Sequence, residues 1–359
     1  MAQSPPATIL LTGSSGLIGT RLQQALAADY HVVGLDKVAP ARELPNTEFV
    51  ETDLTSDESV KAVLDGVRGR HGSRLASCVH LAAYYDFSGE PSPMYERLTV
   101  EGTRRLIRAL DTFEVEQFIF SSSLLVMQPV EAGEPALTEA SPTRAEWDYP
   151  RSKLEAEQVL HDERGRIPVV VLRIAGVYDE RGHSLPIGQH IRRIYEKQLE
   201  SYFFPGNTEH GQPFIHLDDL TACVTRTIER RRELDPWEVF LIAEPEVLSY
   251  ETLQETLGLL IHGKEWPTIR IPKTAARAGA WLKEKVPGAG ESFIKPWMVN
   301  LADQHYPVRV TRASERLGWS PVHRLRDALA PMVDRLKRDP RGWYQEHKFP
   351  LPADLQEAR

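Results

Sequence analysis

A glycine-rich loop near the N-terminus constrains the fold of this chain more than any other feature. The apolar run at residues 7–12 is typical of a buried strand, and a helical pattern follows it that opens on Gly13, Gly16 and Gly19. In such a loop the first glycine permits a tight turn, the second lets the backbone approach a pyrophosphate, and the third lets the helix pack on the strand. The helix N-terminus offers unpaired N–H groups to phosphates. The loop therefore predicts a dinucleotide-binding unit.

Further apolar runs alternate with helical periodicity through the first half of the chain. They lie at residues 31–35, 75–83, 117–123 and 168–174. Alternating strands and helices predict an α/β fold with a doubly wound parallel sheet and helices on both faces. We expect this Rossmann domain to occupy residues 1–180.

The pattern becomes less regular in the second half. It predicts a smaller C-terminal α/β lobe for substrate over residues 181–345, of which 213–242 return to the main sheet. A tail at 346–359 follows, and we expect it to be loosely held from Phe349 onward. Within the second half, helices are predicted at 186–199, 217–232, 249–262, 273–286 and 322–337, and strands at 238–242 and 267–271.

Asp36 follows the second apolar run, about 20 residues after Gly16. A carboxylate at this place is expected to accept hydrogen bonds from the ribose hydroxyls of a dinucleotide and to repel a 2′-phosphate. The adjacent Lys37 could offset part of that repulsion. These residues predict NAD as the cofactor in preference to NADP.

Tyr149 and Lys153 stand at positions i and i+4 of a predicted helix, so their side chains emerge on the same face. Pro150 suits the first turn of that helix, which places Tyr149 at the helix mouth. An ammonium group beside a phenol favours the phenolate and is expected to lower the pKa of Tyr149. The pair predicts an acid/base that can pass a proton near neutral pH.

Several segments in the same order make the chain resemble an extended short-chain dehydrogenase/reductase, a superfamily of nucleotide-sugar epimerases, dehydratases and 3β-hydroxysteroid dehydrogenases. The resemblance covers most of the chain and is strongest in its first part. The matching segments are Thr12–Gly19, the pair Asp53 and Leu54, Val79–Ala83, Val100–Thr103, Phe118–Ser123, Arg173–Tyr178 and Phe214–Asp219.

The resemblance implies a role for three polar side chains. Tyr149 would be the general acid/base on the substrate oxygen, Lys153 would hold the ribose hydroxyls, and Ser123 would hydrogen-bond the reacting group. Either neighbouring serine, Ser121 or Ser122, is an alternative to Ser123. Cofactor contacts are implied for the Tyr149–Lys153 pair and for Gly13, Ser15, Gly16, Leu17, Ile18, Gly19, Asp36, Asp53, Leu54, Leu81, Ala82, Ala83, Ala175 and Val177.

A bulky aromatic segment follows Ala83, where the resemblance places the nicotinamide and the substrate site. We expect this segment and two later side chains to form an apolar wall, although simple packing of the loop is the alternative. Tyr178 lies in the segment that borders the nicotinamide in relatives and is a further candidate. The wall is predicted to consist of Tyr84, Tyr85, Phe87, Leu124 and Met127.

Gln212 stands where nucleotide-sugar enzymes commonly carry an arginine for the substrate diphosphate. That substitution favours a less polar substrate, unless the charge comes from Arg192, Arg193 or Lys197 in the preceding helix. A second departure is Thr99, where many relatives carry an asparagine.

Together these residues favour an NAD-dependent oxidoreductase that transfers a hydride between the nicotinamide and a secondary alcohol or ketone, on the 3β-hydroxysteroid dehydrogenase-like branch. One alternative is a nucleotide-sugar epimerase or dehydratase that retains its NAD. Dehydratases of this group usually carry acidic residues just after the serine, where this chain has Leu124 and Leu125. The other alternative is a non-catalytic NAD-binding regulatory protein, which the intact catalytic residues disfavour.

Charge and composition limit the partners. A formal net charge of −8 disfavours nucleic acid and anionic membranes. There is no apolar run of the roughly 18 residues that a membrane span needs, and the N-terminus lacks the pattern of a signal peptide. We therefore expect a cytoplasmic protein. In relatives, the helices that correspond to residues 93–112 and 150–164 pair across a dimer axis, so the resemblance implies a homodimer.

Cysteine and histidine give no spacing that is typical of a metal site, and we expect none to be needed. Cys78 lies in a strand-like run and Cys223 in a helix-like run, so each is predicted to be a buried free thiol.

Overall fold

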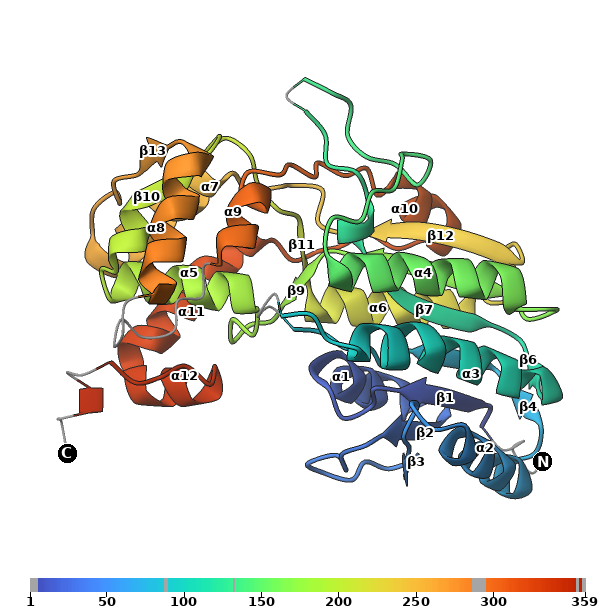
Figure 1. Ribbon diagram of the computed structural model, residues 1–359. Helices are drawn as coiled ribbons and strands as arrows, with labels where there is room; N and C mark the ends of the chain where they lie inside the picture. The colour runs from blue at the N-terminus through green and yellow to red at the C-terminus, as the bar shows by residue number, and fades with distance from the viewer. Residues whose placement is uncertain (1–5, 87–89, 132, 286–294, 353–354, 357–359) are drawn as a thin grey trace.

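The fold is built around one parallel sheet. The structure is a computed structural model that describes residues 6–86, 90–131, 133–285, 295–352 and 355–356. Within them the sheet has seven strands in the order β12-β8-β7-β5-β1-β2-β3, and each adjacent pair is parallel (Figure 1). The strands are β1 (Thr8–Thr12), β2 (His31–Asp36), β3 (Thr47–Glu51), β5 (Ser77–His80), β7 (Phe118–Ser123), β8 (Val169–Ile174) and β12 (Trp237–Ile242).

Helices cover both faces of this sheet, because the apolar runs of its inner strands must be buried on both sides. On one face lie α2 (Asp57–His71), α3 (Glu101–Ala109) and α4 (Asp148–Glu163). On the other lie α1 (Leu17–Leu26), α6 (Leu217–Glu229) and α10 (Thr311–Leu317). The order of the strands reverses between β1 and β5, which is where ligands bind in open α/β sheets. The predicted doubly wound fold is confirmed.

The C-terminal helices gather to one side of the sheet, on the left of Figure 1, around a separate hydrophobic core. That core is formed mainly by α5 (Leu185–Tyr195), α7 (Tyr250–His262), α11 (Leu325–Arg338) and α12 (Pro340–Glu346). Short strands accompany them: β9 (Gly176–Tyr178) pairs with β11 (Phe214–His216), and β10 (Phe203–Pro205) pairs with β13 (Ile269–Ile271). The remaining elements include α8 (Lys273–Lys285), α9 (Pro296–Leu301), β4 (Arg74–Leu75), β6 (Glu114–Val115) and a π-helical turn at Tyr95–Val100.

In this half one sequence expectation is met and one is wrong. The strand expected at residues 238–242 is β12, which pairs with β8 and so returns the chain to the main sheet. The tail is not loosely held at its start, because Phe349 packs on Trp343 with ring centroids 5.6 Å apart, and Leu351 packs on the same core. In the first half of the chain the strand β3 was not predicted: it is an edge strand in which three of the five residues are polar, and it is only partly buried.

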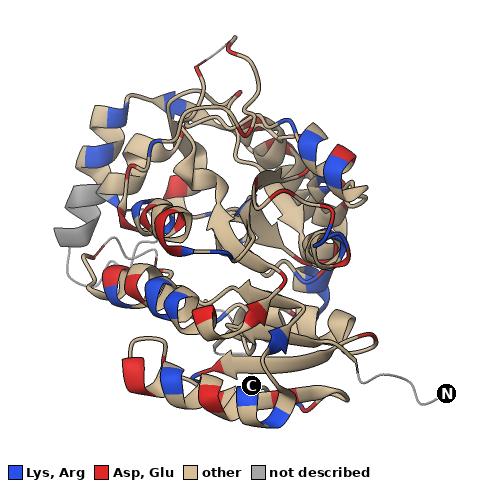
Figure 2. Cartoon of the chain, turned by 90° about the vertical axis from the view of Figure 1, so that its right-hand side faces the viewer, with Lys and Arg blue, Asp and Glu red and all other residues tan. Residues whose placement is uncertain are grey.

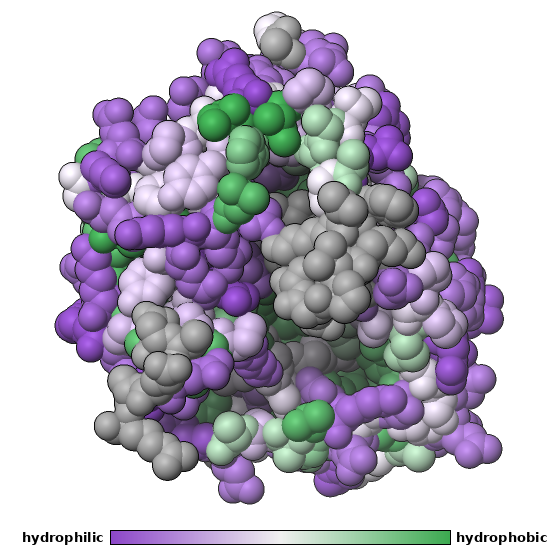
Figure 3. Space-filling view, turned by 60° about the vertical axis from the view of Figure 1, so that its left-hand side comes forward, coloured by the Kyte–Doolittle hydropathy of each residue, from purple (hydrophilic) through white to green (hydrophobic). Residues whose placement is uncertain are grey.

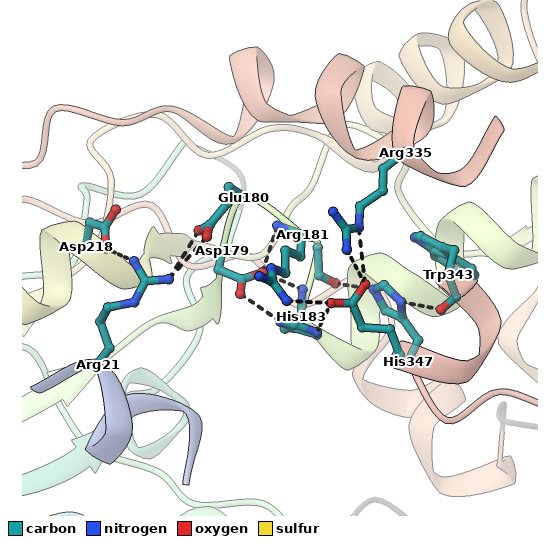
Figure 4. A network of polar contacts seen from close by, with 11 residues as sticks. Arg21, Asp179, Glu180, Arg181, His183, Asp218, Arg335, Trp343 and His347 are labelled. Atoms are coloured by element: carbon teal, nitrogen blue, oxygen red, sulfur yellow. Dashed lines mark hydrogen bonds and ion pairs between the residues drawn. The ribbon is translucent and has the colours of Figure 1, made fainter. Parts of the chain in front are cut away.

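Charged residues are distributed over the helices and between the two halves. Figure 2 shows acidic and basic residues interspersed on the outer helices, whereas the strands are mostly uncharged. A polar network joins α1 to the C-terminal helices, starting at Arg21, which pairs with Asp218 and, at 3.3 Å, with Glu180 (Figure 4). The network continues through Asp179, Arg181, His183, Arg335 and Glu346.

Both cysteines are buried and unpaired, as predicted, and burial raises the pKa of each thiol. Among the residues that the structure describes, we find no helix with both the length and the apolar character of a transmembrane span.

Candidate active site

The glycine loop forms the tight turn that the sequence predicts. Gly13 has φ of 69°, and a Cβ atom placed on it would lie 2.9 Å from the backbone nitrogen of Ala82. A Cβ on Gly19 would overlap the Gly13 carbonyl oxygen. Glycine is therefore required at both positions, by conformation at Gly13 and by close packing at both.

The N-terminus of α1 is open to an anion. Gly16 caps the helix without a side-chain hydrogen bond, and no acidic residue lies in the first turn. The N–H groups of the first turn, including those of Leu17 and Ile18, have no intrahelical partner there. A loop that admits close backbone approach and an uncapped helix end fits the pyrophosphate of a dinucleotide.

Asp36 lies at the carboxyl end of β2, beside this loop. Its carboxylate accepts hydrogen bonds from the backbone N–H of Ser15 at 3.0 Å and of Val38 at 3.3 Å. Lys37 points to a different carboxylate, since its Nζ lies 2.8 Å from Oδ2 of Asp53. The possible compensation of Asp36 by Lys37 is therefore weakened, which supports NAD over NADP.

A buried histidine connects the strand ends beneath the loop. Nδ1 of His80 lies 2.6 Å from Oγ1 of Thr12, and its Nε2 lies 2.9 Å from Oγ1 of Thr103. Because the Thr103 hydroxyl donates to the carbonyl of Thr99 at 2.6 Å, Nε2 of His80 carries the proton. Burial lowers the pKa of His80 to about 3, so the ring stays neutral.

Thr99 belongs to the π-helical turn and positions the aromatic segment. Its Oγ1 accepts a hydrogen bond from the backbone N–H of Tyr84 at 3.0 Å. A single π turn inside a helix is frequent at functional sites. The residue that replaces the usual asparagine thus keeps a side-chain hydrogen bond, and this bond holds the start of the segment Tyr84–Asp86.

Three consecutive serines end β7, and each has a different partner. The Ser121 carbonyl accepts a hydrogen bond from Nζ of Lys153 at 2.7 Å. The Ser122 hydroxyl donates to Glu157. Ser123 is the serine whose side chain hydrogen-bonds Tyr149, and its Oγ also accepts from the backbone N–H of Leu125 at 3.2 Å. The geometry therefore brings Ser123, and neither neighbour, to the tyrosine.

Lys153 is almost completely buried, with 3% of its surface exposed. Its Nζ lies 5.1 Å from the ring centroid of Phe120 and 5.9 Å from that of Tyr149. Burial lowers the pKa of Lys153 to about 7, which the nearby charge of Glu157 opposes. Glu157 itself pairs with Arg173 at 2.7 Å inside the protein.

The expected direction of the Tyr149 pKa is wrong for this structure. Burial raises the pKa of Tyr149 to about 12, and the hydrogen bond from Ser123 lowers it only in part. The spacing of Tyr149 and Lys153 correctly placed both on α4, but Lys153 is bound to the Ser121 carbonyl and its own charge is weakened by burial. Desolvation therefore dominates at the phenol.

Aromatic rings surround Tyr149, and two of them were missed in the sequence. The ring of Tyr85, which is 53% exposed, meets that of Tyr149 edge-on at 4.7 Å between centroids. On another side Trp147 lies 5.5 Å from Tyr149, and Trp297 of α9 lies 5.0 Å from Trp147. Trp147 is close to Tyr149 in sequence and could have been suspected, whereas nothing in the sequence connects Trp297 to it.

The residues of the predicted apolar wall do not all lie in one place. Tyr84 and Tyr85 lie at the site, with Tyr84 edge-on to Tyr95 at 4.9 Å, while Phe87 lies outside the described residues. Leu124 and Met127 are instead buried in the main core, where the Met127 sulfur lies 3.1 Å from Nη1 of Arg173. The remaining candidate, Tyr178, is buried in the C-terminal core and donates to Glu244 at 2.6 Å.

These corrections share a cause. A loop or strand-end side chain can point into the core or into the site, and the sequence alone does not say which. Met127 and Tyr178 are fully buried, so neither is available on an open wall. The predicted cofactor contacts Ala175 and Val177 follow β8 and lie at the edge of the main core.

Gln212 is tied to the backbone of a distant segment. Its amide donates to the carbonyl of Gln304 at 3.0 Å, and the Gln304 amide donates to Glu146 at 2.7 Å, close to Trp147. Of the candidates for a replacement charge, Arg192 pairs with Glu196 at 2.7 Å. Arg193 is partly buried, and burial lowers its pKa.

One face of the molecule is hollowed. Figure 3 shows hydrophobic residues on the walls and rim of this hollow, amid a surface that is otherwise mostly hydrophilic.

The chain is similar to proteins of known family along most of its length. The model of the NAD dependent epimerase/dehydratase family matches residues 9–243. The 3 beta-hydroxysteroid dehydrogenase type 7 of Mus musculus is 24% identical over 360 residues, which cover 89% of this chain and 93% of that protein. The UDP-glucose 4-epimerase of Vibrio cholerae is 25% identical over 333 residues, covering 90% and 94%.

A solved structure shares the fold. The UDP-glucuronic acid 4-epimerase of Bacillus cereus, in complex with UDP-glucuronic acid and NAD, superposes with a TM-score of 0.68 at 22% identity and covers 92% of this chain and 99% of that one. The predictions of an NAD-dependent enzyme and of the extended short-chain dehydrogenase/reductase superfamily are confirmed. The chain belongs to the NAD dependent epimerase/dehydratase family.

Proposed function

We propose that this protein is an NAD-dependent oxidoreductase that interconverts a secondary alcohol and a ketone. The observation that carries the proposal is the arrangement at the end of β7, where Ser123 contacts Tyr149 and the buried Lys153 lies on the same helix. These groups stand at the carboxyl edge of the sheet, as does the glycine loop that fits a dinucleotide. The site therefore combines a proton donor with a place for a hydride carrier.

Each side chain has a distinct task. A bound cofactor would supply the hydride as NADH or accept it as NAD. Tyr149, with its pKa raised to about 12, holds a proton at neutral pH and can donate it to a carbonyl oxygen. Ser123 hydrogen-bonds that oxygen and fixes its position, and Lys153 holds the ribose hydroxyls. In this account the free enzyme is poised for reduction of a ketone.

The substrate of the proposed reaction is largely apolar. Tyr85, Trp147 and Trp297 lie around Tyr149 and offer large flat surfaces for a ring system. Gln212, in place of an arginine, brings no charge to the position that would meet a diphosphate. Both features favour a hydrophobic alcohol over a nucleotide sugar.

A nucleotide-sugar epimerase is the second candidate. It is favoured by the similarity to the UDP-glucose 4-epimerase of Vibrio cholerae, which is nearly as extensive as that to the hydroxysteroid dehydrogenase. Such an enzyme would use the same Tyr149 chemistry but return the hydride to its substrate, so that NADH would not accumulate.

Net turnover of the cofactor separates the two. The purified protein is mixed with NADH and a panel of apolar ketones, and in parallel with NAD and UDP-glucose, and the NADH absorbance is followed. We expect stoichiometric NADH consumption with a ketone and no calorimetric binding of UDP-glucose. Tight binding of UDP-glucose, with epimerised product and constant NADH, would establish the second candidate instead.

We also propose a cytoplasmic homodimer with residues 1–180 as the cofactor domain and 181–345 as the substrate lobe. The dimer is proposed from the family resemblance. The outer face of the α3–α4 pair is strongly charged, so a dimer through it would dissociate at high salt. Light scattering across a salt series tests this, and a monomer at every salt concentration would contradict it. The exposed residues of these two helices include Arg108, Arg151, Glu155 and Gln158, and Glu96 and Arg97 are exposed in the π-helical turn before α3.

A further inference from the structure

A cluster of metal-binding side chains lies at the opposite end of the sheet from the proposed active site. His31, Glu48 and His71 each offer one ligand atom, and these atoms all lie within 4.8 Å of one another. His31 begins β2, whereas Asp36 ends it at the cofactor edge. The cluster is therefore about 17 Å from that edge, from the rise of a strand.

The fold brings the three residues together from separate elements. In the β2–β3 register Val33 pairs with Glu48, so Glu48 shares a face with Val33 and with His31, two residues earlier. Val33 belongs to the core that α2 covers, and His71 is the last residue of α2. All three side chains thus lie between the edge of the sheet and the end of the helix.

The contacts within the cluster leave one nitrogen without a partner. Nε2 of His71 lies 2.7 Å from Oε2 of Glu48, which is close enough for a hydrogen bond. Nε2 of His31 lies 3.9 Å from the same oxygen and, although buried, makes no hydrogen bond to any described residue. The two imidazole rings are 4.6 Å apart between centroids. A buried nitrogen that faces a carboxylate without bonding it is explained if a third group lies between them.

The chemistry of these donors fits a transition-metal ion. Two imidazole nitrogens and one carboxylate oxygen form a ligand set that binds Zn²⁺ at about 2.0–2.2 Å, with water in a fourth position. Ligand atoms around one tetrahedral zinc would be about 3.3 Å apart, between the 2.7 Å and 3.9 Å observed here. Arg70 contacts the other oxygen of Glu48, Oε1, at 2.5 Å and so orients the carboxylate with Oε2 toward the two histidines.

In a second cluster of possible metal ligands, both histidines already have hydrogen-bond partners within the protein. His216, Asp218 and His323 are also close together, but Asp218 pairs with Arg21. Nδ1 of His216 accepts the backbone N–H of Asp218 at 3.1 Å, and Nδ1 of His323 lies 3.0 Å from Asp219. Both histidines of this second cluster already hydrogen-bond other groups, so the cluster serves as an internal control.

We propose that His31, Glu48 and His71 bind one divalent transition-metal ion of the Zn²⁺ type, which clamps the edge strand β3 and the end of α2 to β2. The ion would act on the stability of the fold, because the cluster lies far from Tyr149 and Asp36. A ligand that binds only the folded chain raises its thermal midpoint.

The test uses the full chain without an affinity tag, after treatment with a chelator. Zn²⁺ is titrated by calorimetry, and Co²⁺ is added separately to record the visible bands of a tetrahedral site. We expect one equivalent of Zn²⁺ to bind, intense Co²⁺ bands, and a higher thermal midpoint with Zn²⁺. His31→Ala and Glu48→Gln should each weaken the affinity by about 30-fold, while His323→Gln should leave it unchanged.

Two results would overturn the proposal. One is that the wild-type chain binds no equivalent of Zn²⁺, a result that does not depend on the folding of any variant. The other is Zn²⁺ binding that persists in His31→Ala or is lost in His323→Gln, which would place the ion elsewhere. NAD binding, measured on every variant, reports whether it has folded.

Discussion

The active site and the polar network of the C-terminal half both contain buried ionisable groups, but these groups have different hydrogen-bond partners in the two regions. Lys153 is 3% exposed and donates to a neutral carbonyl, and burial lowers its pKa to about 7. Asp179 is 2% exposed and accepts hydrogen bonds from His183 and from two backbone N–H groups, which hold its pKa at about 2.

This difference indicates that the buried charge of the network stabilises the fold, whereas the buried groups of the site serve proton transfer. In the network the buried charge is matched by its partners, so the folded state favours the ionised form and gains stability from it. At the site the folded state disfavours the charge of Lys153 and the phenolate of Tyr149. Groups held away from their preferred ionisation are expected where protons move.

Tyr149→Phe should have the largest effect and tests whether the site serves chemistry and not stability. Loss of the only proposed proton donor should lower the turnover number by about 10³-fold or more, whereas the free energy of unfolding should change little. Turnover is measured with NADH and a reactive ketone, and NAD affinity by calorimetry. Retention of most of the activity would remove Tyr149 from the mechanism.

Lys153→Met should have opposite effects on activity and on stability. Removal of a lysine that burial makes unfavourable should stabilise the fold by about 1–2 kcal/mol near pH 7, while turnover falls by about 100-fold. Urea denaturation and the NADH assay give the two numbers. A variant that is both inactive and less stable would show that the Nζ bond to Ser121 is mainly structural.

Asp179→Asn tests the other region. The variant should lose about 2 kcal/mol of stability without a change in turnover, and the exposed Glu180→Gln is its matched control. The lowered pKa of Asp179 gives stability that is present above about pH 4 and is lost as the pH falls toward 2.

The partner of Asp179 sets the upper limit of this pH window. The hydrogen bond to Asp179 raises the pKa of His183, so its contribution is complete below about pH 6.5 and is lost as the pH rises through the folded-state value. The difference between wild type and Asp179→Asn should therefore be largest between about pH 4 and pH 6.5. A pH-independent difference would contradict the pairing.

Trp297→Ala should have the smallest of these effects. It removes one ring from the aromatic group beside Tyr149, so KM for an apolar ketone should rise by about tenfold with turnover nearly unchanged. Trp297→Phe should recover most of the loss. If KM is the same in both variants and the wild type, Trp297 does not contact the substrate.

Part of the fold and of the site could be predicted from the sequence. The glycine loop, Asp36 and the strands of the main sheet follow from local patterns, because a buried parallel strand is a continuous apolar run. The edge strand β3 was not predicted in this way, since three of its five residues are polar.

Side-chain direction and long-range contact are what the sequence could not supply. The side chains of Met127 and Tyr178 turn into the two hydrophobic cores and not toward the site. Trp297 reaches Trp147 across a long stretch of chain. The pKa of Tyr149 depends on burial by these distant elements, so the i and i+4 spacing to Lys153 predicted its direction wrongly.

Transfer of label from the cofactor tests the central claim most directly. NADH carrying deuterium at its transferable position is incubated with the enzyme and an apolar ketone, and the alcohol is analysed by mass spectrometry. We expect one deuterium in the product alcohol for each NADH consumed, and almost none with Tyr149→Phe. Constant NADH with unlabelled product, together with epimerisation of a UDP-sugar, would contradict a net oxidoreductase.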